Sequence, residues 1–253
     1  MLNFHKTAFL IIFSYALTAQ AQDTNKEKQA DGTESRSEMD KIQPNDYLEL
    51  VHYTKRAELL KKTSISDIRA LSVIVKNFGD KVPGSKEALE AIKQDYKIGL
   101  RYYYRRAGFH AGKKMEAVDA KIKDLYQKFS NYYETRTDEL LTQCADAIVT
   151  IQENEEINAV NSSTQRILQT SEHKLRFAYF QMSMADKFNR DARFRDSLLH
   201  YRNAKEYGIS LLQDLVSDEA EKKKVLSDFK IDLVDNKNQV YSATETAPAA
   251  TNP

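Results

Sequence analysis

No proline occurs between Pro83 and Pro248, so most of the chain lacks the residue that most reliably ends a helix. The chain of 253 residues also has only 7 glycines, although sheets joined by tight turns need glycine and proline at those turns. Hydrophobic residues still make up 41% of the chain, enough to bury a core. The sequence therefore predicts an all-α fold, an elongated bundle of about six to seven helices.

The longest apolar stripe runs at helical spacing from Met115 to Ile151. It predicts one very long helix of about 40 residues, roughly 60 Å at 1.5 Å per residue. A helix of this length is typical of elongated assemblies. Gly108 and Gly112 come before the stripe, and we expect them to bracket a bend or tight turn.

Shorter stripes precede the long helix. Asp46 is a plausible cap for a first helix that ends near Lys62, and Ser64 is expected to open a second helix. The loop after Phe78 ends that second helix, and Ser85 is expected to cap a third.

The C-terminal part predicts an antiparallel helical hairpin of the tetratricopeptide (TPR) kind, followed by a last helix capped by Ser217. The second helix of the hairpin is expected to run from Arg193 to Val216. The following residues fall at the offsets of one such repeat: Met184, Ala185, Phe188, Ala192, Phe194, Ser197, Leu198, Tyr201 and Ala204. One repeat alone does not make a solenoid.

The two ends of the chain differ in composition from the middle. Residues 1–21 combine a polar start, a ten-residue apolar run and the Ala19-Gln20-Ala21 site of a cleavable secretory signal. We expect a disordered polar tether over 22–44, an elongated helical domain over 45–236 and a disordered tail over 237–253. The protein is thus predicted to be exported, periplasmic in preference to extracellular, with no integral membrane segment after signal cleavage.

Sequence motifs of catalysis are missing. The five histidines are scattered, and there is no zinc-protease motif, phosphate loop or nucleophile elbow. No ligands cluster at metal-binding spacing. We therefore expect no enzyme activity, no catalytic or metal-binding residues and no cofactor. Cys144, the only cysteine, has helical spacing with Leu140 and Ile148, which favours a buried core thiol over an intermolecular disulfide.

Residues 96–115 carry six basic side chains and no acidic one around three consecutive tyrosines. Adjacent tyrosines on a helix point about 100° apart, so at least one should face outward or a partner. Tyrosine and arginine are enriched at interface hot spots, which favours protein binding over internal packing with solvated arginines. Nucleic acid would also suit this pattern, but an exported protein rarely meets it. The candidate partner-binding residues are Arg101, Tyr102, Tyr103, Tyr104, Arg105, Arg106, Lys113 and Lys114.

Residues 137–165 form the acidic counterpart, with six carboxylates and no lysine or arginine. Arg166, Lys174 and Arg176 could neutralise this stretch within the chain. Alternatively it could meet the basic segment of another subunit, a head-to-tail arrangement that builds filaments. The candidate acidic residues are Asp146, Glu153, Glu155 and Glu156.

The apolar leader, the polar tether and the tyrosine-rich segments RYYYRRAGFHAGKK and FQMSMADKFNRDARFRDSLLHYRNAKEYG resemble the flagellar coiling proteins of spirochaetes. Those helical proteins coat the periplasmic flagellar filament and help it to curve. The resemblance covers about Asn45 to Asp235 and includes no diagnostic motif. It implies a non-catalytic sheath component that contacts other filament proteins or itself.

The sequence thus favours a structural or interaction protein of the bacterial periplasm, a component of a filament such as the flagellar sheath. The alternative is a monomeric helical adapter or chaperone-like module that binds a peptide between the two hairpin helices. Met182, Met184, Phe180 and Phe188 would line its groove.

Overall fold

The computed structural model describes residues 43–153 and 162–242, and within those ranges it contains seven helices and no strand. The predicted all-α fold is therefore confirmed. The helices are α2 (Tyr47–Phe78), α3 (Ser85–Tyr104), α4 (Gly108–Glu153), α6 (Ser162–Arg190), α7 (Phe194–Leu215), α8 (Glu219–Asp228) and α9 (Lys230–Asn236). The predicted signal peptide and almost all of the predicted tether lie outside the described residues.

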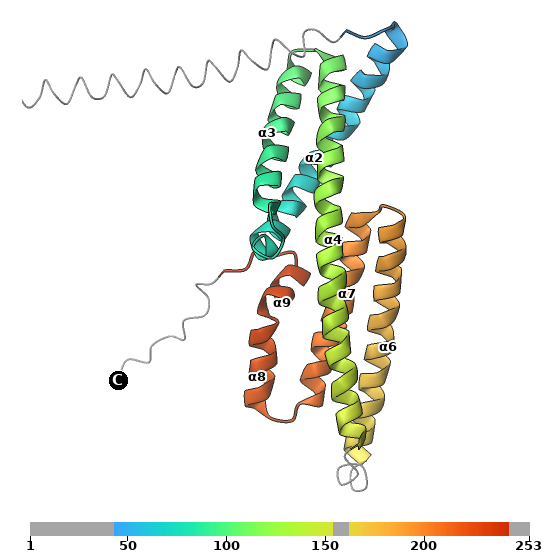
Figure 1. Cartoon of the computed structure of the whole chain (residues 1–253), viewed down its shortest axis with the longest axis vertical. Coiled ribbons are helices and arrows are strands. Elements are labelled where there is room, and N and C mark those ends of the chain that lie inside the picture. Colours follow the sequence, from blue (N-terminus) through green and yellow to red (C-terminus); the bar gives the residue numbers. More distant parts are fainter. Residues whose placement is uncertain (1–42, 154–161, 243–253) are drawn as a thin grey trace, which may run out of the picture.

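Helix α4 runs the length of the molecule (Figure 1). Its 46 residues correspond to about 69 Å, so the very long helix expected from the sequence is present. Helices α2 and α3 pack along its first half, and the antiparallel hairpin of α6 and α7 packs along its second half. The predicted elongated bundle with a helical hairpin is thus the observed architecture.

Two apolar clusters lie one after the other along α4. The first joins α2, α3 and the start of α4 to the loop end of the hairpin, around Leu71, Phe129 and Tyr201. The second joins the end of α4 to α6, α7 and Phe229, around Cys144. Because both clusters share α4, the two halves of the bundle are built on one continuous helix.

Within the described residues, no helix is both long and apolar enough to cross a bilayer.

The predicted break between Lys62 and Ser64 is wrong, because α2 continues through it. Hydroxyl residues suggested a new helix start there. In the structure the Thr63 hydroxyl lies 3.3 Å from the Leu60 carbonyl oxygen of its own helix, and Ser64 is buried. A hydroxyl that bonds back to its own helix does not end that helix. Ser85 likewise does not cap α3: Gly84 holds that position, and the Ser85 hydroxyl donates to the Gly79 carbonyl.

The predicted bend at Gly108 and Gly112 is also misplaced. The turn lies just before them, where Arg106 adopts a left-handed conformation with φ of 60°. The two glycines instead belong to α4 and allow α2 to cross it closely. A Cβ atom on Gly112 would lie 2.3 Å from the Tyr53 carbonyl oxygen, and one on Gly108 would lie 2.3 Å from the Thr54 hydroxyl. Their role is therefore close helix packing.

The chain after α7 differs from prediction as well. The single last helix is divided at Phe229 into α8 and α9. The tail expected to begin at residue 237 remains attached up to Tyr241. Asn77 of α2 donates to the Gln239 carbonyl at 2.8 Å and accepts from the Tyr241 backbone at 2.6 Å. These hydrogen bonds hold the segment after α9 against α2.

Candidate functional site

The three tyrosines of the basic segment point in three directions, as their spacing predicted. Tyr102 is buried in a small cluster with Ala57 and Ala111, so its candidacy as a contact residue is wrong. Tyr103 is half-buried, and the Lys61 ammonium lies 3.9 Å from the centre of its ring. Tyr104 is 74% exposed and makes an edge contact with Tyr103. Only Tyr104 therefore offers most of its ring to a partner.

The two lysines of the segment are engaged within the molecule. The Lys113 ammonium lies 3.7 Å from a Glu49 carboxylate oxygen and 4.7 Å from the centre of the Phe109 ring. Lys114 pairs with Asp95 at 2.7 Å. These contacts tie the start of α4 to α2 and α3, so the expectation that both lysines bind a partner is corrected. Sequence alone could not place Glu49 and Asp95 beside them.

The remaining cations of the segment form an exposed tip. Arg101, Arg105 and Arg106 are exposed and make no ion pair within the described residues. Backbone hydrogen bonds from Arg106 to Tyr103 and from Ala107 to Tyr102, both of 3.0 Å, fold the chain sharply here. We call Arg101, Tyr104, Arg105 and Arg106 the Tyr/Arg tip.

The acidic counterpart lies at the far end of α4. Asp146 and Glu153 are exposed there and take part in no ion pair between described residues, whereas Glu155 and Glu156 lie outside them. The rise from Gly108 to Asp146 is about 57 Å, so the Tyr/Arg tip cannot reach this stretch within one chain. Neutralisation by Lys174 is also not observed, because Lys174 pairs with Asp214 at 2.5 Å.

A buried ionic cluster was missed by the sequence analysis. It fastens α9 to the bundle through two aspartates that are almost wholly enclosed, Asp232 and Asp235. Lys205 of α7 donates to Asp232 at 2.8 Å, and Arg136 of α4 donates to the same carboxylate at 3.1 Å. Tyr133 and Arg202 donate to Asp235. The ammonium of Lys205 also lies 4.2 Å from the centre of the Tyr133 ring.

Burial and charge act against each other in this cluster. Burial lowers the pKa of Lys205 despite the carboxylates beside it. Burial also opposes ionisation of Asp235, yet hydrogen bonds from Arg202 and the charges of Arg202 and Lys205 hold its pKa below the ordinary value. The pKa of Tyr133 is raised far above its ordinary value, by burial and by Asp235. Asp232 and Asp235 are thus already paired with cations and hydrogen-bond donors of the cluster itself. The cluster holds α9 against the bundle, and we call it the clamp.

Cys144 is fully buried, which confirms the predicted core thiol. Its thiol lies 3.3 Å from the Gly208 carbonyl oxygen, and burial raises its pKa to about 12. Within the described residues, no group of three or more histidine, cysteine, aspartate or glutamate side chains is arranged to hold a metal ion.

The groove expected between the hairpin helices does not form as predicted. Met182 packs against the core, whereas Phe180 is exposed to solvent, so these residues do not share one face. Phe188 is covered by the His200 ring, at 5.1 Å between ring centres, and by the Arg193 guanidinium at 4.4 Å. The exposed aromatic side chains of the hairpin are instead Phe177, Tyr179, Phe180 and Tyr207.

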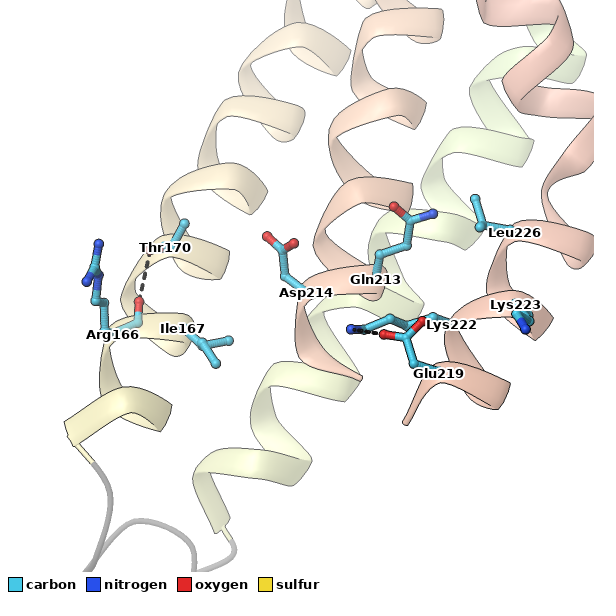
Figure 2. A pocket seen from close by; sticks show the side chains of 9 residues that line it. All are labelled: Arg166, Ile167, Thr170, Gln213, Asp214, Glu219, Lys222, Lys223 and Leu226. Carbon is cyan, nitrogen blue, oxygen red and sulfur yellow. Dashed lines mark hydrogen bonds and ion pairs between the residues drawn. The ribbon is translucent and has the colours of Figure 1, made fainter. Parts of the chain in front are cut away.

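A different groove opens where α8 stands away from α6, across the end of α7 (Figure 2). Its volume is about 1020 Å³. Its walls and floor carry Arg166, Ile167, Thr170, Gln213, Asp214, Glu219, Lys222, Lys223 and Leu226. No residue of α8 is buried, which explains why this side remains open.

No family model, curated protein or solved structure matches this chain. The resemblance to flagellar coiling proteins therefore stays a prediction.

Proposed function

We propose that the protein is an exported, non-catalytic structural subunit that assembles with other proteins through the ends of its rod. The single observation that carries this proposal is the Tyr/Arg tip, whose three arginines make no ion pair within the described residues. Exposed Tyr104 beside them adds a large apolar ring to a cluster of charge. Tyrosine and arginine are the residues that most often anchor protein interfaces.

The distribution of charge favours an assembly role. Exposed carboxylates, including Asp146 and Glu153, lie near the opposite end of α4 from the tip. Complementary charges mainly steer and orient association. With the predicted export signal and the resemblance stated above, this favours a periplasmic filament component, such as a subunit of the flagellar sheath, whose partners are filament proteins or copies of itself.

A second candidate function rests on the exposed aromatic side chains of the hairpin. The rings of Phe177 and Tyr207 lie 4.7 Å apart, and Phe180 lies beside them at 6.1 Å from Phe177. Clustered exposed aromatics are typical of surfaces that bind apolar peptides or partner helices. This observation favours the adapter alternative, in which a monomer binds a peptide on the outside of the hairpin.

Fractionation of the periplasm tests the first proposal. The wild-type protein is expected to co-purify with a filament. Replacing Arg101, Arg105 and Arg106 together by Glu should release it into the soluble fraction at unchanged helix content, because exposed arginines contribute little to stability.

The matched control replaces three exposed cations elsewhere, Lys62, Lys76 and Arg176, by Glu. This control makes the same change in net charge and should stay with the filament. Release of both variants would assign the effect to net charge, and retention of both would place the contact away from the tip.

A further inference from the structure

The first turn of α2 exposes large apolar side chains at one end of the rod. Tyr47 and Leu48 are each 75% exposed. Asp46 caps the helix by accepting the Glu49 backbone N–H at 2.7 Å, and its carboxylate makes no ion pair within the described residues. We call Asp46–Leu48 the α2 knob. Exposed apolar side chains that lie together are typical of surfaces that bind a partner.

The groove between α6, α7 and α8 offers a matching surface. Ile167 on one wall and Leu226 on the other are each 42% exposed (Figure 2). Its volume of about 1020 Å³ is at the upper limit of typical binding pockets, roughly 300–1,000 Å³. A helical turn laid between these walls would cover apolar side chains on both sides, as in helix-in-groove recognition.

The charges of knob and groove are complementary. Inside the groove, Lys222 pairs with Glu219 at 2.9 Å, and Asp214 is paired with Lys174. These pairs leave Arg166 and Lys223 as the cations without an ion pair among the described residues. The knob carries the carboxylate of Asp46, so, among the described residues, the unpaired charges of the groove are positive and that of the knob is negative.

Knob and groove lie at opposite ends of the molecule (Figure 1). The knob is next to the start of α4, where Glu49 pairs with Lys113. The groove is next to its other end, where Gln152 donates to Glu172 of α6 at 2.8 Å. The rise along α4 from Lys113 to Gln152 is about 58 Å, so a chain cannot fill its own groove.

We propose that the α2 knob of one copy inserts into the α6–α7–α8 groove of the next, so that the protein forms linear head-to-tail chains. This inference rests on the proposed function and names a second copy as the partner at the groove. The contact is heterologous, because it joins two different surfaces. Each added copy leaves one free knob at one end of the chain and one free groove at the other, so copies can be added at both ends and the chain does not close.

Sedimentation of the purified protein tests the inference with two variants. The knob variant replaces Tyr47 and Leu48 by Ser, and the groove variant replaces Ile167 and Leu226 by Ser. The wild type should form species that grow with concentration, and each variant alone should stay monomeric. An equimolar mixture should form dimers and nothing larger, because the intact knob of one variant fits the intact groove of the other.

A control variant replaces Leu59 and Leu199, two exposed apolar residues outside both surfaces, by Ser and should assemble like the wild type. Circular dichroism checks that all variants keep their helix content. A monomeric wild type, or a mixture of variants that stays monomeric, would overturn the inference. If such a monomer still co-purified with a filament through its Tyr/Arg tip, the proposed function would stand without it.

Discussion

Lys205 illustrates how one side chain joins distant parts of this fold. Its ammonium is fully buried between the rings of Phe78 and Tyr133 and is 2.8 Å from Asp232. We predict that Lys205→Met lowers the free energy of unfolding by about 3–5 kcal/mol, because it leaves a buried carboxylate with only Arg136 as its cation. Chemical denaturation followed by circular dichroism measures this loss.

The double variant Lys205→Met with Asp232→Leu separates the ion pair from simple packing. It should be more stable than the single variant, because both buried charges are gone. Lys86→Met, which removes an exposed lysine paired with Asp80, should leave the denaturation midpoint unchanged. If the double variant were less stable to denaturant than Lys205→Met, this account of the clamp would be contradicted.

Asp235 makes the clamp sensitive to acid. Its pKa in the folded protein lies below the ordinary value of 3.8, although burial alone would raise it. When the pKa of a carboxyl is lower in the folded than in the unfolded protein, its ionised form stabilises the folded state. This stabilisation is complete at pH values above the unfolded-state pKa, and it is lost as the pH falls from there towards the folded-state pKa. We predict that Asp235→Asn lowers the melting temperature at neutral pH and reduces its fall below about pH 4. Thermal melts across that pH range measure both effects. If the melting temperature of the variant fell as steeply with acid as that of the wild type, Asp235 would not be the source of the acid sensitivity.

At the scale of elements, the crossing of α2 over α4 depends on Gly112. A Cβ atom there would meet the Tyr53 backbone, which cannot move aside without shifting α2. We predict that Gly112→Ala lowers the free energy of unfolding by about 1–3 kcal/mol, the usual cost of overpacking, although alanine is the better helix former. Urea denaturation provides the measurement.

Gly208→Ala is the matched comparison within another helix. There the added Cβ would lie 3.1 Å from the side chain of Leu140, which can yield by a small rotation. We predict a change near zero, because the gain in helix propensity offsets the tighter contact. Equal losses at Gly112 and Gly208 would show that backbone proximity is not what distinguishes the two sites.

Periodicity predicted the helices well where an apolar stripe runs unbroken, as along α4. It failed where local polar residues suggested ends, as at Ser64, because the sequence does not reveal that Thr63 bonds back to its own helix. The site was predicted less completely than the fold. Helical geometry predicted that at least one of the three adjacent tyrosines is exposed, but it did not identify Tyr104 as that residue. The pairing of Lys114 with Asp95 is a tertiary contact that no spacing predicts. The only local signal of the clamp was a lysine, Lys205, within an apolar stripe.

At the scale of the whole molecule, α4 determines the distance between the two ends. Its buried residues extend from Phe109 to Ile148, first against α2 and α3 and then against α6 and α7. A bend in the middle would open one of the two apolar clusters. The proposed end-to-end contacts also require a rigid spacer, because a flexible link would let the ends take many relative orientations.

The straightness of α4 is therefore the last prediction. Spin labels on Ala117→Cys and Thr150→Cys, two exposed positions of α4, should lie about 50 Å apart, from 33 steps of 1.5 Å. The buried thiol of Cys144 is replaced by Ala in both labelled and control proteins, so that only the introduced cysteines react. Pulsed electron paramagnetic resonance should give one narrow distance distribution, because packing on both halves holds the helix. A broad distribution, or a mean far below 50 Å, would show a hinge in α4 and exclude its role as a rigid spacer.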